Sequence, residues 1–230
     1  MSEFKGFPQK GLDFLANLAR HNEKGWFEAN RNAYQEFLVA PALAFIADFG
    51  TLLQKKISKD IVFSTRTNGS GSLFRIYRDT RFSADKTPYK THVGVFFWEG
   101  PGKKMTNPGF YFHLEFDGAF MYAGKYEFST QELHKYRDAV ANDKSGKELE
   151  KAIASVRKSG EYETAAEHYK RVPAGYTPDH PRAGLLRQNT LFAKSPLIPV
   201  KSITSPKLLD VCLEHSKNMD PLLRWLVKTL

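Results

Sequence analysis

The sequence predicts one α+β domain over residues 1–230, in which an antiparallel β-sheet meander packs against N-terminal and C-terminal helices. Three observations predict this class. Apolar residues recur at helical spacing through residues 1–60, alternate at strand spacing within residues 61–128, and return to helical spacing over residues 129–230. Neither an internal repeat nor a long linker divides the chain, so we expect a single domain.

Three helices are expected in the first part of the chain. The first runs through residues 12–19 and ends near His21, and the second follows a break at Gly25. Pro41 suits the first turn of a third helix, where its missing N–H group is not needed. The expected core stripe of this third helix is Leu43, Ile46, Phe49, Leu53 and Ile57.

A sheet is expected in the middle of the chain. The expected strands are residues 61–63, 91–98, 110–117 and 120–122. The second of these ends at a turn, Gly100-Pro101-Gly102, and the tight pair Asp117-Gly118 predicts a hairpin between the last two. Alternation places Phe110, Phe112, Leu114 and Phe116 on one face and Tyr111, His113, Glu115 and Asp117 on the other.

Helices return towards the C-terminus. Thr130 is the expected N-cap of one helix, and Ser145 with Glu148 has the spacing of a capping box for the next. Residues 171–206 contain six prolines and are expected to form an ordered, winding connection. Residues 208–230 close the chain as one or two helices.

The charge balance favours an anionic partner. The chain has 34 Lys and Arg against 25 Asp and Glu, a net charge of +9, and residues 61–110 and 171–230 each carry +5 of it. A solvated basic surface is the alternative explanation. Cys212 is the single cysteine and is expected in the core, which excludes an internal disulfide framework and a cysteine-rich zinc site.

The sequence also bears on the cellular compartment of the protein and on the cofactors that it could bind. The first residues lack the apolar run of a secretory signal, and the charge-free apolar stretch at residues 37–47 is too short to span a bilayer. We therefore expect a cytoplasmic protein with no membrane partner. No phosphate-binding glycine-rich motif, nucleophile elbow or helical zinc motif occurs, so no cofactor and no metal is predicted.

The segment at residues 74–92, FRIYRDTRFSADKTPYKTH, contains the candidate site. Its predicted anion-binding residues are Arg75, Arg78, Arg81, Lys86 and Lys90. The three arginines recur every three residues, a spacing that an irregular loop can bring to one point, and guanidinium groups suit phosphate or carboxylate. The structural alternative pairs Arg78 with Asp79 and Arg81 with Asp85 as ion pairs that hold the loop.

This segment contains the pattern R-x-x-R-D-x-R-F-x-x-x-[D/N]-K-x-x-Y without departure, from Arg75 to Tyr89. With this pattern the chain resembles a family of bacterial proteins of similar length, also found as a region of larger fungal proteins. The resemblance extends over most of the chain. It includes N-E-K-G-W-F-E-A-N-R-N-A-Y at residues 22–34 and an R-x-P-x-G-Y segment at residues 171–176. The family is one of unknown function, so the resemblance implies no catalytic residue.

Histidines outside this segment give weaker signals. His113 shares a predicted strand face with Glu115 and Asp117, which fits a solvent-facing strand better than a metal site. His180 precedes Pro181 and contributes to a site only if the fold brings it near the arginines.

Three functional hypotheses follow. The preferred one is a phosphate- or polyanion-binding protein, with nucleic acid or a phosphorylated small molecule as partner. The second is an enzyme acting on a small anionic substrate, with Asp79 or Asp85 as general base and Tyr89 or His92 assisting. Neighbouring guanidinium groups lower the pKa of such a carboxylate and weaken it as a base. The third is an adaptor in which the arginines and aspartates only stabilise the loop.

Overall fold

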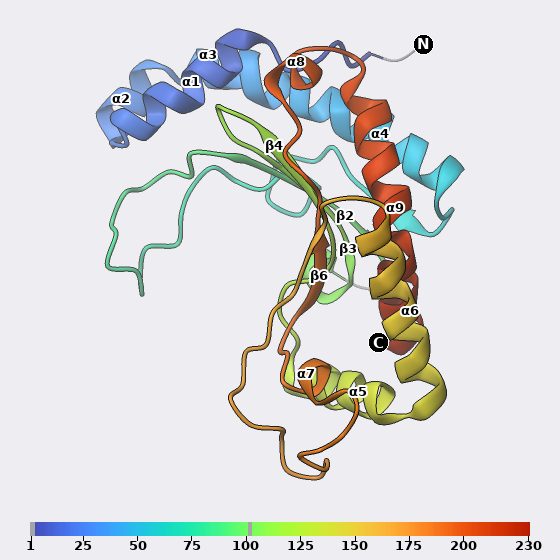
Figure 1. The fold of residues 1–230 in the computed structure, drawn as a ribbon. Coiled ribbons are helices and arrows are strands. Elements are labelled where there is room, and N and C mark those ends of the chain that lie inside the picture. The colour runs from blue at the N-terminus through green and yellow to red at the C-terminus, as the bar shows by residue number, and fades with distance from the viewer. Residues whose placement is uncertain (1–2, 101–102) are drawn as a thin grey trace.

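The computed structural model describes residues 3–100 and 103–230 and has the predicted α+β architecture (Figure 1). Its six strands form one antiparallel sheet in the order β1-β2-β3-β4-β6-β5. Helices cover one face of this sheet, and the opposite face is not covered by any labelled helix in Figure 1. We call this second surface the open face.

The strands are β1 (Ile61–Val62), β2 (Val93–Glu99), β3 (Gly109–Leu114), β4 (Ala119–Lys125), β5 (Glu163–Thr164) and β6 (Leu191–Lys194). The predicted hairpin at Gly118 is confirmed, because the Glu115 amide donates to the Gly118 carbonyl at 2.8 Å. Phe110, Phe112 and Leu114 are buried as expected. The placement of Phe116 was wrong: β3 ends at Leu114, and 47% of Phe116 is exposed. The turn predicted at residues 100–102 lies partly outside the described residues.

The longer helices are α1 (Gln9–Arg20), α4 (Ala40–Lys56), α5 (Thr130–Ala141), α6 (Asp143–Lys158) and α9 (Leu208–Thr229). The short ones are α2 (Lys24–Ala29), α3 (Arg31–Tyr34), α7 (Ala183–Leu186) and α8 (Val200–Ile203). A π-helical turn, Gln35–Val39, joins α3 to α4, and a 3-10 turn, Lys104–Thr106, lies between β2 and β3.

The helix at Pro41 is longer than expected. Arg31–Lys56 is one continuous helical run, because the proline follows a π-helical turn and does not begin a separate helix. By length and composition alone this run is apolar enough to cross a membrane. Its side chains Phe45, Ile46 and Phe49 are fully buried, as in the core helix of a globular domain.

Helix caps differ from the predictions by a few residues. Ser129, not Thr130, caps α5 and forms a capping box with Glu132. Helix α6 begins after Asn142, whose side chain accepts from the Ser145 amide, so the predicted Ser145 capping box was wrong.

The connection at residues 171–206 contains more regular structure than its prolines suggested. Strand β6 inserts between β4 and β5 and buries Leu191 and Ala193. The prediction of an entirely helical region after residue 129 was therefore wrong for β5 and β6. Cys212 is fully buried in α9, as predicted.

Candidate anion-binding site

The signature segment forms a two-stranded arm, which we define as residues 73–92. Leu73 forms an antiparallel bridge to Val95 of β2, and Tyr77 forms one to Tyr89. The outgoing chain of the arm therefore pairs first with β2 and then with the returning chain that leads into β2. The Arg78 amide donates to the Pro88 carbonyl at 2.9 Å. Figure 1 shows this arm projecting from the sheet beneath α2. An extended arm separates its arginines along its length, whereas the sequence interpretation expected a loop that brings them together.

The N-terminal helices fix the return strand of the arm. The Asn22 side chain donates to the Tyr89 carbonyl at 2.8 Å and accepts from the Tyr89 amide at 3.0 Å. The Tyr89 ring stacks on Phe27 with centroids 4.2 Å apart. Tyr89 is only 2% exposed, so its side chain packs in the core and is not open to a ligand. The asparagine and phenylalanine both lie in the N-terminal stretch that resembled the family.

Ion pairs occupy the tip of the arm. Arg78 bonds Asp85 at 2.5 Å and also the Thr87 carbonyl and hydroxyl. Arg81 holds Asp79 through two hydrogen bonds of 3.0 and 2.7 Å. The structure therefore contains an arginine–aspartate clamp, but with the partners exchanged relative to the sequence interpretation.

Hydrogen bonds and ion pairs at the tip lower the pKa of Asp79 and Asp85, the two candidate general bases. Hydrogen bonds from the Arg81 side chain and amide lower the pKa of Asp79 to about 2. Hydrogen bonds from Thr87, and then from Arg78, lower the pKa of Asp85 to about 2. Both carboxylates are ionised and already bonded at neutral pH, which makes them weak proton acceptors. Lys86 donates to the Thr80 carbonyl at 2.9 Å, within the same tip.

Three cations lie near one another at the base of the arm, and two of them lie over one aromatic ring. We call Arg75, Lys90 and Lys104 the arm-base cations. The ammonium groups of Lys90 and Lys104 lie 5.6 and 4.1 Å from the centroid of Phe74. Lys90 donates to the Arg75 carbonyl at 3.0 Å and Lys104 to the Gly71 carbonyl at 2.6 Å. Among the described residues, no acidic group lies within 4.0 Å of these three cations.

The electrostatic effect of this grouping appears in the lysines. Burial and then Lys90 and Arg75 lower the pKa of Lys104 to about 8. Burial and then Arg75 also lower the pKa of Lys90. The sequence analysis predicted Arg75 and Lys90 as site residues but missed Lys104. Lys104 follows β2 in the sequence, and the fold places its side chain against Phe74 of the arm. The only available signal was the positive charge of residues 61–110 as a whole.

His92 lies directly before β2, on the same side of the sheet as His113 of β3. The two imidazoles have centroids 4.2 Å apart. His113 bonds the Tyr111 hydroxyl at 3.2 Å and Glu115 at 3.0 Å through its two ring nitrogens. Burial, then His113 and Lys90, lower the pKa of His92 to about 4, so it is neutral at pH 7. Among the described residues, no group of three His, Cys, Asp or Glu side chains is placed to hold a metal ion.

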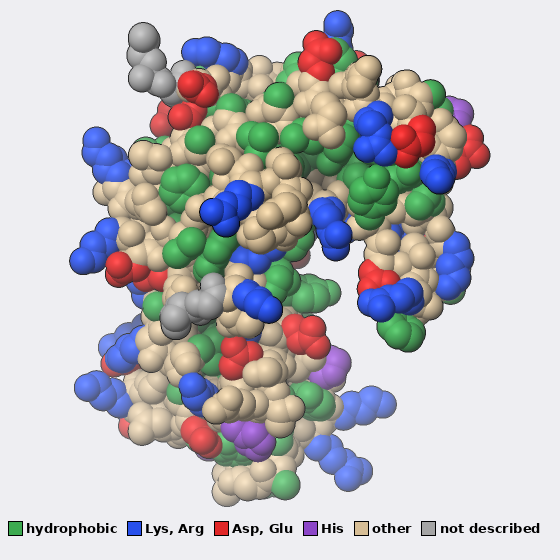
Figure 2. All heavy atoms as spheres, turned by 180° about the vertical axis from the view of Figure 1, so that it is seen from behind, with side chains coloured by type: hydrophobic (Ala, Val, Ile, Leu, Met, Phe, Trp, Pro, Cys, Tyr) green, Lys and Arg blue, Asp and Glu red, His purple; other side chains and the backbone are tan. Residues whose placement is uncertain are grey.

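A hollow lies beside the open face. Figure 2 shows it between the projecting arm and the body below, and cationic side chains are visible on both of its sides. Strand alternation directs half-buried aromatic rings to this face, since the core faces of β3 and β4 carry the fully buried residues. The half-buried rings of the open face include Phe74, Phe96, Tyr111, Phe120, Tyr122 and Phe192.

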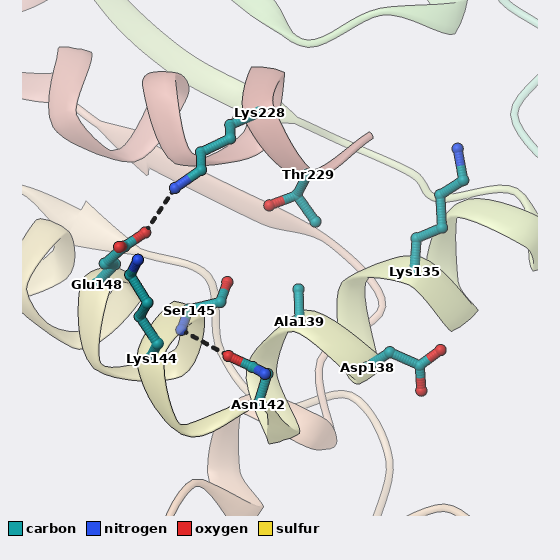
Figure 3. Close-up of a pocket in the computed structure, with 9 residues that line it drawn as sticks. All are labelled: Lys135, Asp138, Ala139, Asn142, Lys144, Ser145, Glu148, Lys228 and Thr229. Atoms are coloured by element: carbon teal, nitrogen blue, oxygen red, sulfur yellow. Dashed lines mark hydrogen bonds and ion pairs between the residues drawn. The ribbon is translucent and has the colours of Figure 1, made fainter.

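Another cavity of about 540 Å³ lies between α5, α6 and the end of α9 (Figure 3). Several of its polar groups already have structural partners. Lys228 pairs with Glu148 at 3.0 Å, and Asn142 caps the amide of Ser145. These contacts hold the ends of three helices together.

The second family-like segment is also structural. The Tyr176 hydroxyl donates to Asp138 of α5 at 2.7 Å, and the Arg182 amide donates to His180 at 3.0 Å. The segment of His180 lies with α7 beside α5, at the opposite end of the molecule from the arm (Figure 1). The fold therefore does not bring His180 to the arginines.

Comparison with known proteins agrees with the resemblance noted from the sequence. A search of the curated proteins finds no match to this chain. The model of a family of conserved hypothetical proteins, DUF2461, matches residues 10–225. Because the match includes the N-terminal helices, the arm, the sheet and most of α9, the chain belongs to this family.

Proposed function

We propose that the protein binds a phosphate-bearing anion at the arm-base cations. The observation that carries the proposal is that Lys90 and Lys104 lie over Phe74 with Arg75 nearby, and that none of the three has an acidic partner among the described residues. Burial is the main cause of the lowered pKa of Lys104, and repulsion from Lys90 and Arg75 lowers it further. A bound anion offsets the repulsion among these cations and stabilises the protonated form of Lys104.

The geometry favours an oxyanion with several acceptor atoms. A guanidinium group offers a planar pair of donors, and two ammonium groups add donors from other directions. Each lysine uses one of its N–H donors on a backbone carbonyl and keeps the others for a ligand. Phosphate and its esters present three or more such oxygens.

The arm-base cations carry this role better than the arm tip does. Arg78 and Arg81 are neutralised by Asp85 and Asp79, whereas the arm-base cations are not. The enzyme hypothesis lacks comparable support, since both candidate bases are engaged by arginine or threonine. We therefore place the binding role at the base of the arm and a clamping role at its tip.

Calorimetric titration with inorganic tripolyphosphate tests the proposal. We expect binding that weakens as salt rises, and at least about a tenfold loss of affinity in Lys90→Gln/Lys104→Gln. The matched control is Lys55→Gln/Lys56→Gln, which removes two exposed charges from the end of α4 and should bind like wild type. Equal affinity of the two double variants, both folded by circular dichroism, would refute the site.

A further inference from the structure

The aromatic side chains of the open face form a continuous row across the sheet. Strand register places Phe96 opposite Tyr111, Tyr111 opposite Tyr122, and Tyr122 opposite Lys194. Ring centroids are 5.8 Å apart for Phe74 and Tyr111, and 6.0 Å apart for Tyr111 and Tyr122. Phe192 continues the row at 5.9 Å from Tyr122.

The row begins at the arm-base cations. Phe74, its first ring, is the ring over which the ammonium groups of Lys90 and Lys104 lie. The row then crosses β3 and β4 to reach β6, where Lys194 stands at its far end. Lys194 is paired with Glu163 at 3.3 Å, so the cations without an acidic partner among the described residues lie at the Phe74 end of this strip of aromatic surface.

The length of the row indicates a ligand with several bases. Neighbouring strands lie about 4.8 Å apart, so the distance from β2 to β6 is about 14 Å. A single nucleoside phosphate stacks on one or two rings, whereas this row offers a ring on each successive strand. Proteins that bind single strands combine this kind of stacking surface with cations that hold the backbone.

The acidic groups of this face already have cationic or imidazole partners. Glu115 bonds His113 at 3.0 Å, and Glu163 bonds Lys194 at 3.3 Å. Glu115 follows the end of β3, and Glu163 lies on the edge strand β5. Burial, and then these two carboxylates, raise the pKa of Tyr122, which Lys194 lowers. The rings between them carry no acidic neighbour opposite them in the register.

We propose that the open face binds single-stranded nucleic acid, with phosphates at the arm-base cations and unpaired bases stacked along Phe74, Tyr111, Tyr122 and Phe192. The proposal rests on the proposed anion-binding function and names its ligand class. Single strands fit better than duplexes, because a base must be free of its pairing partner and its stack to lie on a side-chain ring.

Fluorescence anisotropy with labelled oligonucleotides tests it. The probes are an oligothymidylate of about twelve nucleotides, an abasic chain of the same length and a duplex. We expect the oligothymidylate to bind at least about tenfold more tightly than the abasic chain, with the duplex weaker than the oligothymidylate.

Variants divide the site into its two parts. Tyr122→Leu/Phe192→Leu keeps apolar bulk on the face but removes two rings. It should lower the affinity for oligothymidylate to about that for the abasic chain and leave the abasic chain unaffected. Lys90→Gln/Lys104→Gln should weaken both. The matched control is Tyr126→Leu, whose ring is 83% exposed and lies outside the row.

The outcomes separate the two proposals. If oligothymidylate and the abasic chain bind equally and only the lysine variant weakens them, the anion site stands and the stacking surface is wrong. If neither single-stranded probe binds, the nucleic-acid proposal fails, and the tripolyphosphate titration decides whether the anion site stands. Tighter binding of the duplex, or full affinity for oligothymidylate in folded Tyr122→Leu/Phe192→Leu, would also overturn the stacking surface.

Discussion

The ammonium group of Lys104 lies 4.1 Å from the centroid of Phe74 and donates a 2.6 Å hydrogen bond to the Gly71 carbonyl. This contact brings the turn after β2 to the base of the arm. It also half-buries the Lys104 ammonium group beside Lys90 and Arg75. This burial, and then the two neighbouring charges, lower the pKa of Lys104. The same contact gives the candidate site a measurable pH dependence.

Anion binding should weaken as pH rises from 7 to 9. With a pKa of about 8, Lys104 is mostly protonated at pH 7 and mostly neutral at pH 9. An anion stabilises the protonated form, so we expect the affinity to fall by up to about tenfold over this range. The probe is an abasic oligonucleotide, whose phosphodiester charge stays constant there. Lys104→Arg keeps its charge and should flatten the profile, and an unchanged slope in this variant would assign the titration to another group.

Loss of Asn22 should destabilise the arm. Asn22→Ala leaves both the amide and the carbonyl of Tyr89 without their side-chain partner, at a cost of about 1–3 kcal/mol. Urea denaturation measures the global effect, and hydrogen exchange at residues 88–92 measures the local one. Tyr89→Phe is the companion variant. No hydrogen bond of the Tyr89 hydroxyl occurs among the described residues, so we expect wild-type stability and ligand binding from it. A loss of ligand binding in Tyr89→Phe would instead show that the Tyr89 hydroxyl belongs to the binding site.

The two arginines of the arm tip should behave differently. Arg78 bonds Asp85 and Thr87 on the opposite side of the tip. The hydrogen bonds of the Arg81 side chain among the described residues go to the neighbouring Asp79, and Arg81 is largely exposed. Arg78→Ala should therefore accelerate hydrogen exchange and proteolysis at residues 79–87, while Arg81→Ala leaves both close to wild type. Neither change should lower tripolyphosphate affinity by more than about twofold. A large loss of binding in Arg81→Ala would restore the tip as the anion site.

The sequence predicted the fold class and the basic segment well because both depend on local pattern. Alternation of apolar residues marks β3 directly, and the positive charge of the arm is visible in its composition. Strand β6 was not predicted, because its four residues are too few to show an alternating pattern. Its position between β4 and β5 is set by pairing with distant parts of the chain.

The composition of the candidate site depends on register and on long-range contact. The pairing of Tyr77 with Tyr89 fixes which arm residues lie together, and a run of arginines three residues apart does not reveal that pairing. Lys104 joins Arg75 only because its side chain crosses to Phe74. The ion-pair partners differ from the expected ones for the same reason. The turn at the tip of the arm brings Asp85 next to Arg78, and this proximity is not visible in the sequence.

Stability should depend on His92 below neutral pH. Burial, with His113 and Lys90 nearby, holds the pKa of His92 at about 4 in the folded state, below its ordinary value of 6.5. The unfolded chain therefore takes up this proton first, and the free energy of unfolding falls as pH decreases from 6.5 to 4. After allowance for solvent screening, we expect about 1–2 kcal/mol from this residue.

Urea denaturation at pH 7 and pH 4.5 measures this contribution. His92→Gln stays neutral at both values and should lose less stability than wild type on acidification. His134→Gln, on the exposed side of α5, is the matched control and should lose as much as wild type. Carboxylates that titrate in the same range contribute equally to all three proteins and cancel in the comparison. Equal losses in His92→Gln and His134→Gln would show that protonation of His92 carries no penalty, and that the imidazole pair at 4.2 Å opens readily to solvent.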